Sequence, residues 1–326
     1  MILIPDAVFE DDHAIERAEV APLALLVRRA KTAGDVADEE WAAADAVIAY
    51  HRMTYDAALC AKLARCRIMV RAGVGYDNID LPSFAARGIP VCNVPDYGIG
   101  EVADHTIALL LALVRGVVEF HRGIAADPVR GWDWRRWPRP VRRLKGQRLL
   151  IVGFGRVGAA VSRRAAALDL AITCYDPLRQ HTEGVARADD LDAALANADL
   201  VSLHAALPAG AGPLIDRRRL AVMPRGAILI NTARGGLVDL EALGDALRAD
   251  HIAAAALDVL PGEPPDPAHP LIAALAADET WLRGRLILTP HTAFLSREAI
   301  TEMRRKAAAT AAAYLRDGTL VNRVNR

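Results

Sequence analysis

The sequence of 326 residues has few cysteines, no excess of either charge and no long apolar run. The four cysteines, Cys60, Cys66, Cys92 and Cys174, form no CxxC pair, and no histidine cluster accompanies them. Metal sites need ligands at closer and more regular spacing. We therefore expect buried thiols in a reducing compartment and no bound metal.

The longest uninterrupted apolar run, Ile107–Val114, is far shorter than the roughly 20 residues that cross a bilayer. The first residues reach acidic side chains after a short apolar start, without the basic and long apolar regions of a signal peptide. The 40 basic and 40 acidic residues cancel, whereas a basic excess drives nucleic-acid binding. We expect a cytoplasmic protein without a membrane or nucleic-acid partner.

One segment does combine aromatic and basic side chains, as surfaces that stack nucleic-acid bases do. Trp132, Trp134 and Trp137 alternate there with arginines that include Arg139. Prolines surround these residues and a predicted strand follows. We interpret the segment as a loop that packs against a neighbouring part of the protein.

Short aliphatic runs alternate along the chain with longer amphipathic stretches, a pattern typical of parallel sheets with helices on both faces. The predicted strands are Ala46–Tyr50, Ile68–Arg71, Arg148–Val152, Ala171–Tyr175, Leu200–Leu203, Ala227–Asn231, Ala253–Val259 and Leu286–Leu288. The predicted helices include Val102–Phe120, Val157–Leu168, Leu191–Ala196, Arg217–Ala221, Leu240–Ala249 and Arg297–Leu315. The fold class is therefore α/β, with two doubly wound parallel-sheet domains.

The division of the chain follows from where these elements fall. Six of the strands lie in residues 101–293, which we predict to be a dinucleotide-binding domain. Residues 1–100 form a smaller alternation. The last helix has no strand after it, so residues 294–326 are predicted to return to the first domain, which would be the substrate domain.

A glycine pattern follows the predicted strand Arg148–Val152 directly and opens the next helix. Gly153, Gly155 and Gly158 fit the GxGxxG pattern, with Arg156 and Val157 between the last two glycines. The first glycine permits a tight turn, the second lets a pyrophosphate approach the backbone, and the third lets helix and strand pack closely. Free N–H groups at the helix N-terminus then face the phosphates. The alternative is a glycine turn without a ligand.

The cofactor preference depends on Asp176, which lies at the end of the next predicted strand, 18 residues after Gly158. A carboxylate at this place accepts hydrogen bonds from the adenosine ribose and repels a 2′-phosphate. The position therefore predicts NAD rather than NADP. Arg179 nearby could accommodate a 2′-phosphate, and Asp176 could also be a turn residue before Pro177.

Three further loops each place a charged or titratable residue after a predicted strand. Arg234 follows Ala227–Asn231, Glu263 follows the strand before Asp258, and His291 follows Leu286–Leu288. In an open parallel sheet, the loops beyond the carboxyl ends of the strands meet at the ligand crevice. The three side chains are therefore expected to converge despite their separation in sequence.

These loops resemble those of the D-isomer-specific 2-hydroxyacid dehydrogenase family. The likeness extends to the segments 71–80, 93–105 and 142–146 and covers nearly the whole chain. The segment 289–299 and the pair Tyr50-His51 are most similar to the C-terminal-binding-protein-like branch. The resemblance implies a Rossmann-type domain inserted in a smaller flavodoxin-like substrate domain. It also implies a homodimer, and the apolar helix around Ala108–Val114 is either its interface or a buried core helix.

The chemistry of a 2-hydroxy acid agrees with this resemblance. Arg234 is suited to hold the carboxylate, because its planar guanidinium makes two parallel hydrogen bonds. His291 is suited to exchange a proton with the hydroxyl or ketone oxygen. Glu263 is expected to accept from the other ring nitrogen of His291 and so to fix its tautomer. The alternatives are a structural ion pair, a packed histidine and a surface carboxylate.

The remaining assignments come from the family. Cofactor contacts are implied for Asp258, which would face the nicotinamide carboxamide, and for His204, Thr232, Ala233 and Thr106. Substrate contacts are implied for the backbone of Val74 and Gly75 and for the side chains of Tyr50, His51, Arg52, Tyr76 and Phe294. Each of the five side chains could instead serve packing. Two departures concern the pocket: His204 lacks the family's proline two residues later, and Phe294 stands where co-repressor members have tryptophan.

The sequence thus predicts an NAD-dependent oxidoreductase that interconverts a D-2-hydroxy acid and a 2-oxo acid by hydride transfer. The small-molecule substrate would bind in the cleft between the domains. One alternative is an interaction protein that senses NAD(H), like the co-repressors of the same branch, with incidental turnover. The other is a relative that oxidises a different acid, such as formate or a phosphonate.

Overall fold

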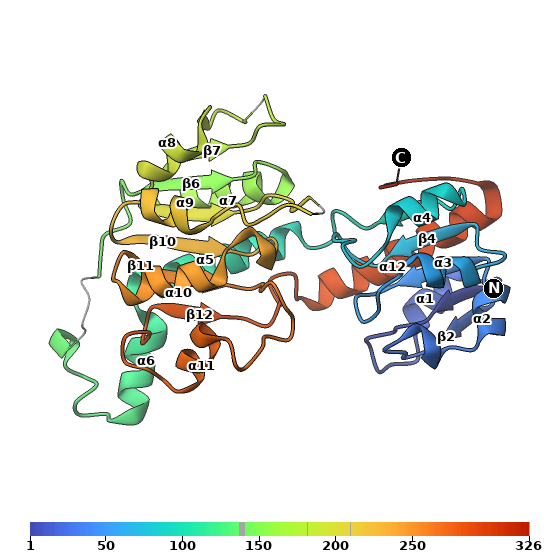
Figure 1. Ribbon diagram of the computed structural model, residues 1–326, viewed down its shortest axis with the longest axis horizontal. Coiled ribbons are helices and arrows are strands. Elements are labelled where there is room, and N and C mark those ends of the chain that lie inside the picture. Colours follow the sequence, from blue (N-terminus) through green and yellow to red (C-terminus); the bar gives the residue numbers. More distant parts are fainter. Residues whose placement is uncertain (137–140, 181, 209, 326) are drawn as a thin grey trace. The chain divides into compact units, whose positions relative to one another are not determined.

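The computed structural model describes residues 1–136, 141–180, 182–208 and 210–325, so Trp137 and Arg139 lie outside the described residues. The chain forms two compact units. Unit 1 comprises Met1–Gly98 and Leu295–Arg326, and unit 2 comprises Ile99–Phe294. Each unit holds one parallel sheet with helices on both faces (Figure 1). The predicted α/β class with two doubly wound domains is confirmed.

Unit 1 has a five-stranded parallel sheet in the order β2-β1-β3-β4-β5, which is the flavodoxin-like order. Its strands are β1 (Ile2–Ile4), β2 (Leu25–Val27), β3 (Ala46–Ala49), β4 (Ile68–Arg71) and β5 (Val91–Asn93). Its helices are α1 (Ala14–Val20), α2 (Asp38–Ala43), α3 (Ala57–Lys62), α4 (Leu81–Ala86) and α12 (Arg297–Asp317), with a short 3-10 turn at Ala33–Asp35. The strand order reverses between β1 and β3.

The sheet of unit 1 is buried on both faces, which explains why its strands are apolar throughout rather than alternating. One face packs against Trp41, Leu59 and Phe84 from the three helices α2, α3 and α4. The helices α1 and α12 lie against each other, and α12 contacts β3 and β4. The C-terminal helix therefore belongs to the same unit as the N-terminal strands.

Unit 2 has a seven-stranded parallel sheet in the order β12-β11-β10-β9-β6-β7-β8. Counted from β6, this is the Rossmann order with one further strand. Its strands are β6 (Arg148–Val152), β7 (Ala171–Tyr175), β8 (Ala186–Arg187), β9 (Leu200–Leu203), β10 (Ala227–Asn231), β11 (Ile252–Leu257) and β12 (Leu286–Leu288). Its helices are α5 (Ile99–Arg115), α6 (Val117–Ala126), α7 (Arg156–Ala166), α8 (Leu191–Ala196), α9 (Arg217–Val222), α10 (Leu240–Arg248) and α11 (Pro270–Ala276), with 3-10 turns at Trp134–Arg136 and Gly235–Leu237.

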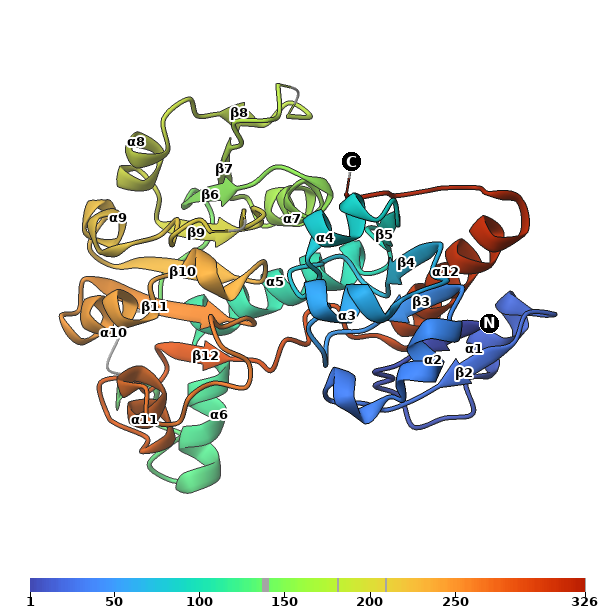
Figure 2. The same cartoon turned by 45° about the vertical axis from the view of Figure 1, so that its right-hand side comes forward.

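Two apolar clusters fill the faces of this sheet. Leu150 and Val152 of β6 belong to the cluster formed with α8, α9, α10 and α11. Leu149 and Ile151, which point the other way, belong to the cluster formed with α5 and α7. Figure 2 shows these helices on the two sides of the strands within unit 2. The carboxyl ends of all seven strands consequently lie along one edge, where the predicted site residues follow them.

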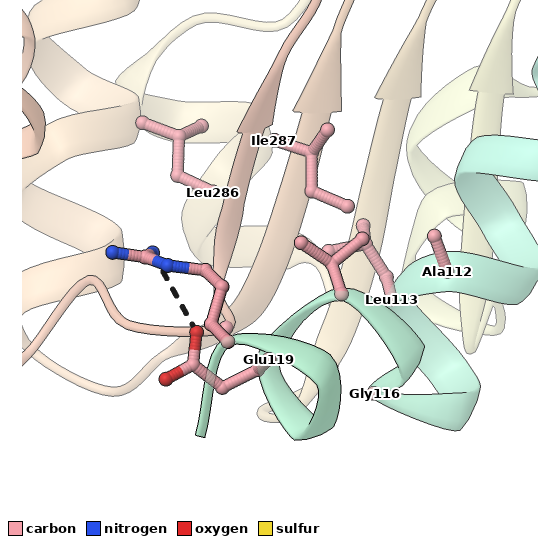
Figure 3. A pocket seen from close by; sticks show the side chains of 9 residues that line it. Ala112, Leu113, Gly116, Glu119, Leu286 and Ile287 are labelled. Carbon is pink, nitrogen blue, oxygen red and sulfur yellow. Dashed lines mark ion pairs between the residues drawn. The ribbon is translucent and has the colours of Figure 1, made fainter. Parts of the chain in front are cut away.

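The predicted single helix Val102–Phe120 is wrong, because the chain forms α5 and α6 with Gly116 between them. Gly116 has φ 65°, in the left-handed region that favours glycine. Figure 3 shows the small hollow that the break leaves beside Ala112, Leu113 and the strand β12. Glu119 and Arg122 of α6 both line it and form an ion pair with each other, with 3.7 Å between nitrogen and oxygen.

Other differences concern short elements and strand ends. The strands β1, β2, β5 and β8 were not predicted. The predicted strand Ala46–Tyr50 ends at Ala49, and Ala253–Val259 is shifted to Ile252–Leu257. Within the described residues, no helix is long and apolar enough to cross a membrane.

Candidate active site

Three neighbouring strands of unit 2 carry the three predicted catalytic residues. β10, β11 and β12 are adjacent and parallel. Arg234 follows β10, Glu263 lies in the loop after β11, and His291 follows β12. The strand order therefore explains why residues about 30 positions apart in sequence converge at one edge.

The loop after β10 is shaped by Asn231, whose side chain is fully buried. Its amide nitrogen donates to the carbonyl of Arg234 at 2.8 Å, and its amide oxygen accepts from the N–H of Ala233 at 3.0 Å. Gly235, which follows Arg234, approaches the loop after β11 so closely that a Cβ there would lie 1.9 Å from the carbonyl carbon of Leu260. A larger residue would push the two loops apart.

Glu263 and His291 form a direct hydrogen bond. The Nδ1 atom of His291 lies 2.7 Å from Oε2 of Glu263, while Oε1 accepts from the N–H of Leu260 at 3.0 Å. The His291 side chain is 48% exposed, so the ring is open to a ligand. Since an ionised carboxylate only accepts, Nδ1 carries the hydrogen and Nε2 is left for another partner.

The pKa of Glu263 lies below its usual value because of its hydrogen bonds and the charges near it. Burial acts to raise it, but hydrogen bonds from His291 and from the N–H of Leu260, with the charges of His291 and Arg234, outweigh burial. The carboxyl group is therefore ionised near neutral pH. Arg234 is one of the charges that act on Glu263, and it follows the neighbouring strand β10.

The turn that carries His291 wraps around the buried carboxylate of Asp258. Oδ1 accepts from the hydroxyl of Thr289 at 2.6 Å and from the N–H of Thr292 at 2.9 Å, and Oδ2 accepts from the N–H of Ala293 at 2.9 Å. The carbonyl of Asp258 accepts from the N–H of His291 at 2.8 Å. Asp258 thus holds the turn, and its contact with nicotinamide stays a prediction.

The backbone after β6 fits the phosphates of a dinucleotide. Gly153 has φ 92°, and a Cβ there would lie 2.6 Å from the backbone of His204 and Ala205. A Cβ at Gly158 would lie 2.2 Å from the carbonyl oxygen of Gly153, whereas the space beside Gly155 is open for 4 Å. Gly155 precedes the first residue of α7. The free N–H groups at the start of α7 therefore lie next to an open space.

Other predicted cofactor residues lie around this loop. Asp176 accepts from the N–H of Phe154 at 2.8 Å and from the N–H of Leu178 at 2.9 Å. His204 follows β9 and shares a hydrogen bond of 2.8 Å with Ser202, and its Nδ1 atom is buried with no partner among the described residues. Burial lowers the pKa of His204 to about 4. An uncharged imidazole with an unused nitrogen at this place fits a polar ligand atom.

Two more predicted cofactor residues touch each other. The hydroxyl of Thr106 on α5 lies 2.8 Å from that of Thr232 after β10 and donates to the carbonyl of Val102. Arg156 is exposed in the first turn of α7, and Val157 and Ala233 pack partly against the two apolar clusters. Together these residues fit a dinucleotide laid along the carboxyl ends of β6, β9 and β10.

The predicted substrate residues fall in both units. Tyr50, at the end of β3, is 1% exposed and its hydroxyl donates to Glu16 at 3.2 Å, so the packing alternative fits it. His51 is exposed, as are Val74 and Tyr76 in the loop after β4, and Gly75 between them is partly buried. In unit 2, the ring of Phe294 meets that of His291 edge to face, with 6.3 Å between centroids.

Sequence reasoning did not assign roles to Asn231, Thr289 and His105. His105 on α5 lies 3.1 Å through its Nε2 atom from the hydroxyl of Thr289. Each of the three is a polar residue close in sequence to a predicted site residue, which could have indicated it: Asn231 precedes Thr232, Thr289 lies near His291, and His105 precedes Thr106.

Comparison with known proteins places this site in a family. Residues 107–293, more than half of the chain, match the model for the NAD binding domain of the D-isomer specific 2-hydroxyacid dehydrogenases. A D-3-phosphoglycerate dehydrogenase of Mycobacterium leprae is 38% identical over 224 residues, which are 68% of this chain and 42% of that protein. The chain thus spans less than half the length of the curated relatives it matches.

Two solved structures are similar over almost the whole chain. The TT0316 protein of Thermus thermophilus is 31% identical, with a TM-score of 0.83 over 99% of this chain and 100% of that one. A D-lactate dehydrogenase of Aquifex aeolicus, complexed with NAD and lactic acid, is 25% identical, with a TM-score of 0.84 over 98% and 96%. The likeness to the C-terminal-binding-protein-like branch stays a prediction. The chain therefore belongs to the D-isomer specific 2-hydroxyacid dehydrogenase family, and its unit 2 contains the family's NAD binding domain.

Proposed function

We propose that this protein is an NAD-dependent oxidoreductase that interconverts a D-2-hydroxy acid and a 2-oxo acid. The observation that carries the proposal is the hydrogen bond of 2.7 Å between His291 and Glu263, beside Arg234, at the carboxyl ends of three adjacent strands. Relatives named for 3-phosphoglycerate and lactate, both 2-hydroxy acids, support the substrate class. Because these two relatives are named for acids with different side chains, the proposal specifies the substrate class and not the side chain of the substrate.

In this proposal the three residues have separate tasks. The guanidinium of Arg234 binds the substrate carboxylate through two parallel hydrogen bonds. Nε2 of His291 receives the hydroxyl proton in oxidation and returns it to the ketone oxygen in reduction. Glu263 holds Nδ1–H and offsets the positive charge of the imidazolium that forms. The nicotinamide ring, when bound, supplies or accepts the hydride.

A panel of 2-oxo acids from glyoxylate to aryl pyruvates tests the proposal through NADH consumption by the purified protein. Rapid, NADH-dependent turnover of one member would support it and report the size of the pocket. Tight NADH binding without turnover of any member would contradict it. That result would favour the NAD(H)-sensing alternative or a substrate outside the 2-oxo acids.

Arg234→Lys is expected to lower kcat/KM by about a hundredfold or more, because an ammonium cannot reproduce the bidentate fork. The Kd for NADH, measured by fluorescence titration, is expected to stay within about twofold, because the glycine loop that binds the phosphates follows β6 rather than β10. Arg225→Lys at the amino end of the same strand is the matched control. A parallel loss of NADH binding with the fold intact would show that the division of roles is wrong.

Asp176→Ser is expected to reduce the preference for NADH over NADPH by about a hundredfold. The carboxylate, held by the N–H groups of Phe154 and Leu178, lies beside the glycine loop, where it repels a 2′-phosphate. Serine removes that charge, while Arg179 remains available to the phosphate. The ratio of kcat/KM for the two cofactors measures the change. An unchanged ratio would mean that another group selects the cofactor.

Two finer expectations belong to this proposal. Every described residue of α6 is at least partly exposed, and Val117, Val118, Trp132 and Trp134 are large apolar side chains on the surface. This supports a homodimer through α6 and the segment that follows it, which sedimentation velocity tests, whereas Leu109, Leu110 and Leu113 of α5 are buried within unit 2, as the core-helix alternative predicts. The four cysteines are buried and unpaired, which supports the proposed reducing, cytoplasmic compartment.

A further inference from the structure

We propose that His105 is a positioning residue for the catalytic base, acting through Thr289 and Asp258 to hold the turn that carries His291. The inference rests on the proposed function of His291 and adds a residue to it. His105 lies on α5, 184 positions from Thr289 in sequence. It is therefore a long-range contact between a helix and the loop after β12, inside unit 2.

The contacts form one continuous chain. Nε2 of His105 lies 3.1 Å from the hydroxyl oxygen of Thr289 and 3.6 Å from Oδ1 of Asp258. The Thr289 hydroxyl lies 2.6 Å from the same Oδ1. The carboxylate of Asp258 then accepts two backbone N–H groups from the far side of the turn, those of Thr292 and Ala293.

The direction of these hydrogen bonds follows from the number of hydrogens available. Asp258, with its side chain 1% exposed, accepts from two N–H groups and from Thr289, which is the pattern of an ionised carboxylate. The single hydroxyl hydrogen of Thr289 is thereby used. Nε2 of His105 must then carry a hydrogen and donate it to the hydroxyl oxygen. The hydrogen bonds therefore run from His105 through Thr289, before His291, to Asp258, which in turn binds the N–H groups after His291.

The turn needs this support because His291 has φ 53°, in the left-handed region that side chains rarely adopt. Such a conformation is unfavourable for a residue other than glycine, and it persists only where surrounding contacts fix it. The N–H of His291 donates to the carbonyl of Asp258, so the carboxylate and carbonyl of one residue hold the turn from within. His105 holds Thr289, where the turn begins.

The proposal accounts for a partly buried imidazole on α5. The neighbouring residues Ala103 and Thr106 are buried, and the side chain of His105 is 24% exposed. An apolar residue of the same size would fill the space but could not donate. The uncharged hydroxyl of Thr289 would then lack its second partner, and its own hydrogen bond to Asp258 would no longer be oriented.

Hydrogen exchange on the full-length protein tests the positioning role without reference to any substrate. In His105→Leu, the amides of peptide 289–294 are expected to exchange about tenfold faster, because the turn opens locally. His105→Gln, whose amide can donate from a similar place, is expected to restore slow exchange. His251→Leu, which removes a histidine hydrogen bond to the carbonyl of Leu220 away from this turn, is the control. Unchanged exchange in His105→Leu, or equally fast exchange in both His105 variants, would overturn the proposal.

Kinetics give the second readout. His105→Leu is expected to lower kcat for a 2-oxo acid by about tenfold to a hundredfold, since small displacements of a catalytic group are costly, and to leave the Kd for NADH within about twofold. His105→Gln should recover most of kcat. Adding His105→Leu to Thr289→Val should cause little further loss, because both changes interrupt the same chain. If the losses of kcat in the two single variants multiplied in the double variant, the positioning role would be overturned.

The two proposals fail in different ways. If the wild-type protein turns over no 2-oxo acid, the proposed function fails while the exchange experiment still decides whether His105 holds the turn. If the wild-type protein is active and His105→Leu matches it in kcat and in exchange, the positioning role fails while the proposed function stands.

Discussion

His291→Asn is expected to lower kcat for the preferred 2-oxo acid by about a thousandfold or more, while NADH binds as in the wild type. A positioned acid–base group contributes about a hundredfold to ten-thousandfold, and the loss of Nε2 removes that contribution entirely. Stopped-flow measurement of NADH consumption gives kcat, and fluorescence titration gives the Kd for NADH.

Asparagine is the informative substitution because it preserves what surrounds the ring. Its amide nitrogen can donate to Glu263 from near the position of Nδ1, so the carboxylate keeps a partner. Asparagine also adopts the left-handed backbone with φ 53° more readily than most residues. The turn around Asp258 is therefore retained, and the measured loss reports proton transfer rather than a rearranged loop.

His251→Asn, at the partly buried histidine directly before β11, is the control for the substitution itself. Glu263→Gln completes the comparison, because the amide keeps a hydrogen-bond acceptor for Nδ1–H but removes the charge. Its loss is expected to be smaller, about tenfold to a hundredfold. A His291→Asn enzyme that keeps a tenth or more of wild-type kcat would assign the proton transfer to another group.

The sequence was most informative where a local rule fixes the backbone. Arg148–Val152 followed by Gly153, Gly155 and Gly158 predicted a strand, a tight turn and a helix, because only glycine fits the close approaches at two of these positions. The parallel α/β pattern likewise predicted that the loops carrying Arg234, Glu263 and His291 lie at one edge of the sheet, although it did not predict that β10, β11 and β12 are neighbours.

The sequence was less informative where a contact depends on distant residues. The strands β1, β2 and β5 have three residues each, too few for a clear periodic pattern. Tyr50 was a candidate pocket residue, yet its hydroxyl binds Glu16, 34 positions away. No local pattern indicates that His105 meets Thr289. The break at Gly116 was visible only as one glycine within an otherwise helical run.

Arg304→Met is expected to destabilise unit 1 by about 3–5 kcal/mol, because it leaves a buried carboxylate without its cation. The guanidinium is 3% exposed and donates to both oxygens of Glu16 at 2.6 and 2.7 Å, and to Asp11. Glu16 lies on α1 and Arg304 on α12, so this pair joins the two ends of the chain that make up unit 1. Urea denaturation with hydrogen exchange of unit 1 peptides measures the loss separately from unit 2.

The acid dependence of the same cluster gives the sign of a second effect. The hydrogen bond from Arg304 lowers the pKa of Asp11 from its usual 3.8 to about 2. A carboxyl with a lowered pKa in the folded state contributes stability above its unfolded pKa, and that stability is lost as the pH falls toward 2. Wild-type unit 1 is therefore expected to lose stability between about pH 4 and pH 2 through Asp11, and Arg304→Met is expected to lack this component. The exposure of Asp11 keeps the component small.

The double variant Arg304→Met with Glu16→Leu separates a lost attraction from an unpaired charge. Replacing a buried ion pair with apolar side chains of similar volume is often nearly neutral, so the double variant is expected to recover most of the stability that Arg304→Met loses. Arg305→Met, the exposed neighbour on α12, is the matched control. A single-variant loss below about 1 kcal/mol would mean that Glu16 finds other partners, with Tyr50 and His13 the nearest. A double variant as unstable as Arg304→Met would instead mean that the pair itself, rather than the cost of one stranded carboxylate, holds α12 to α1.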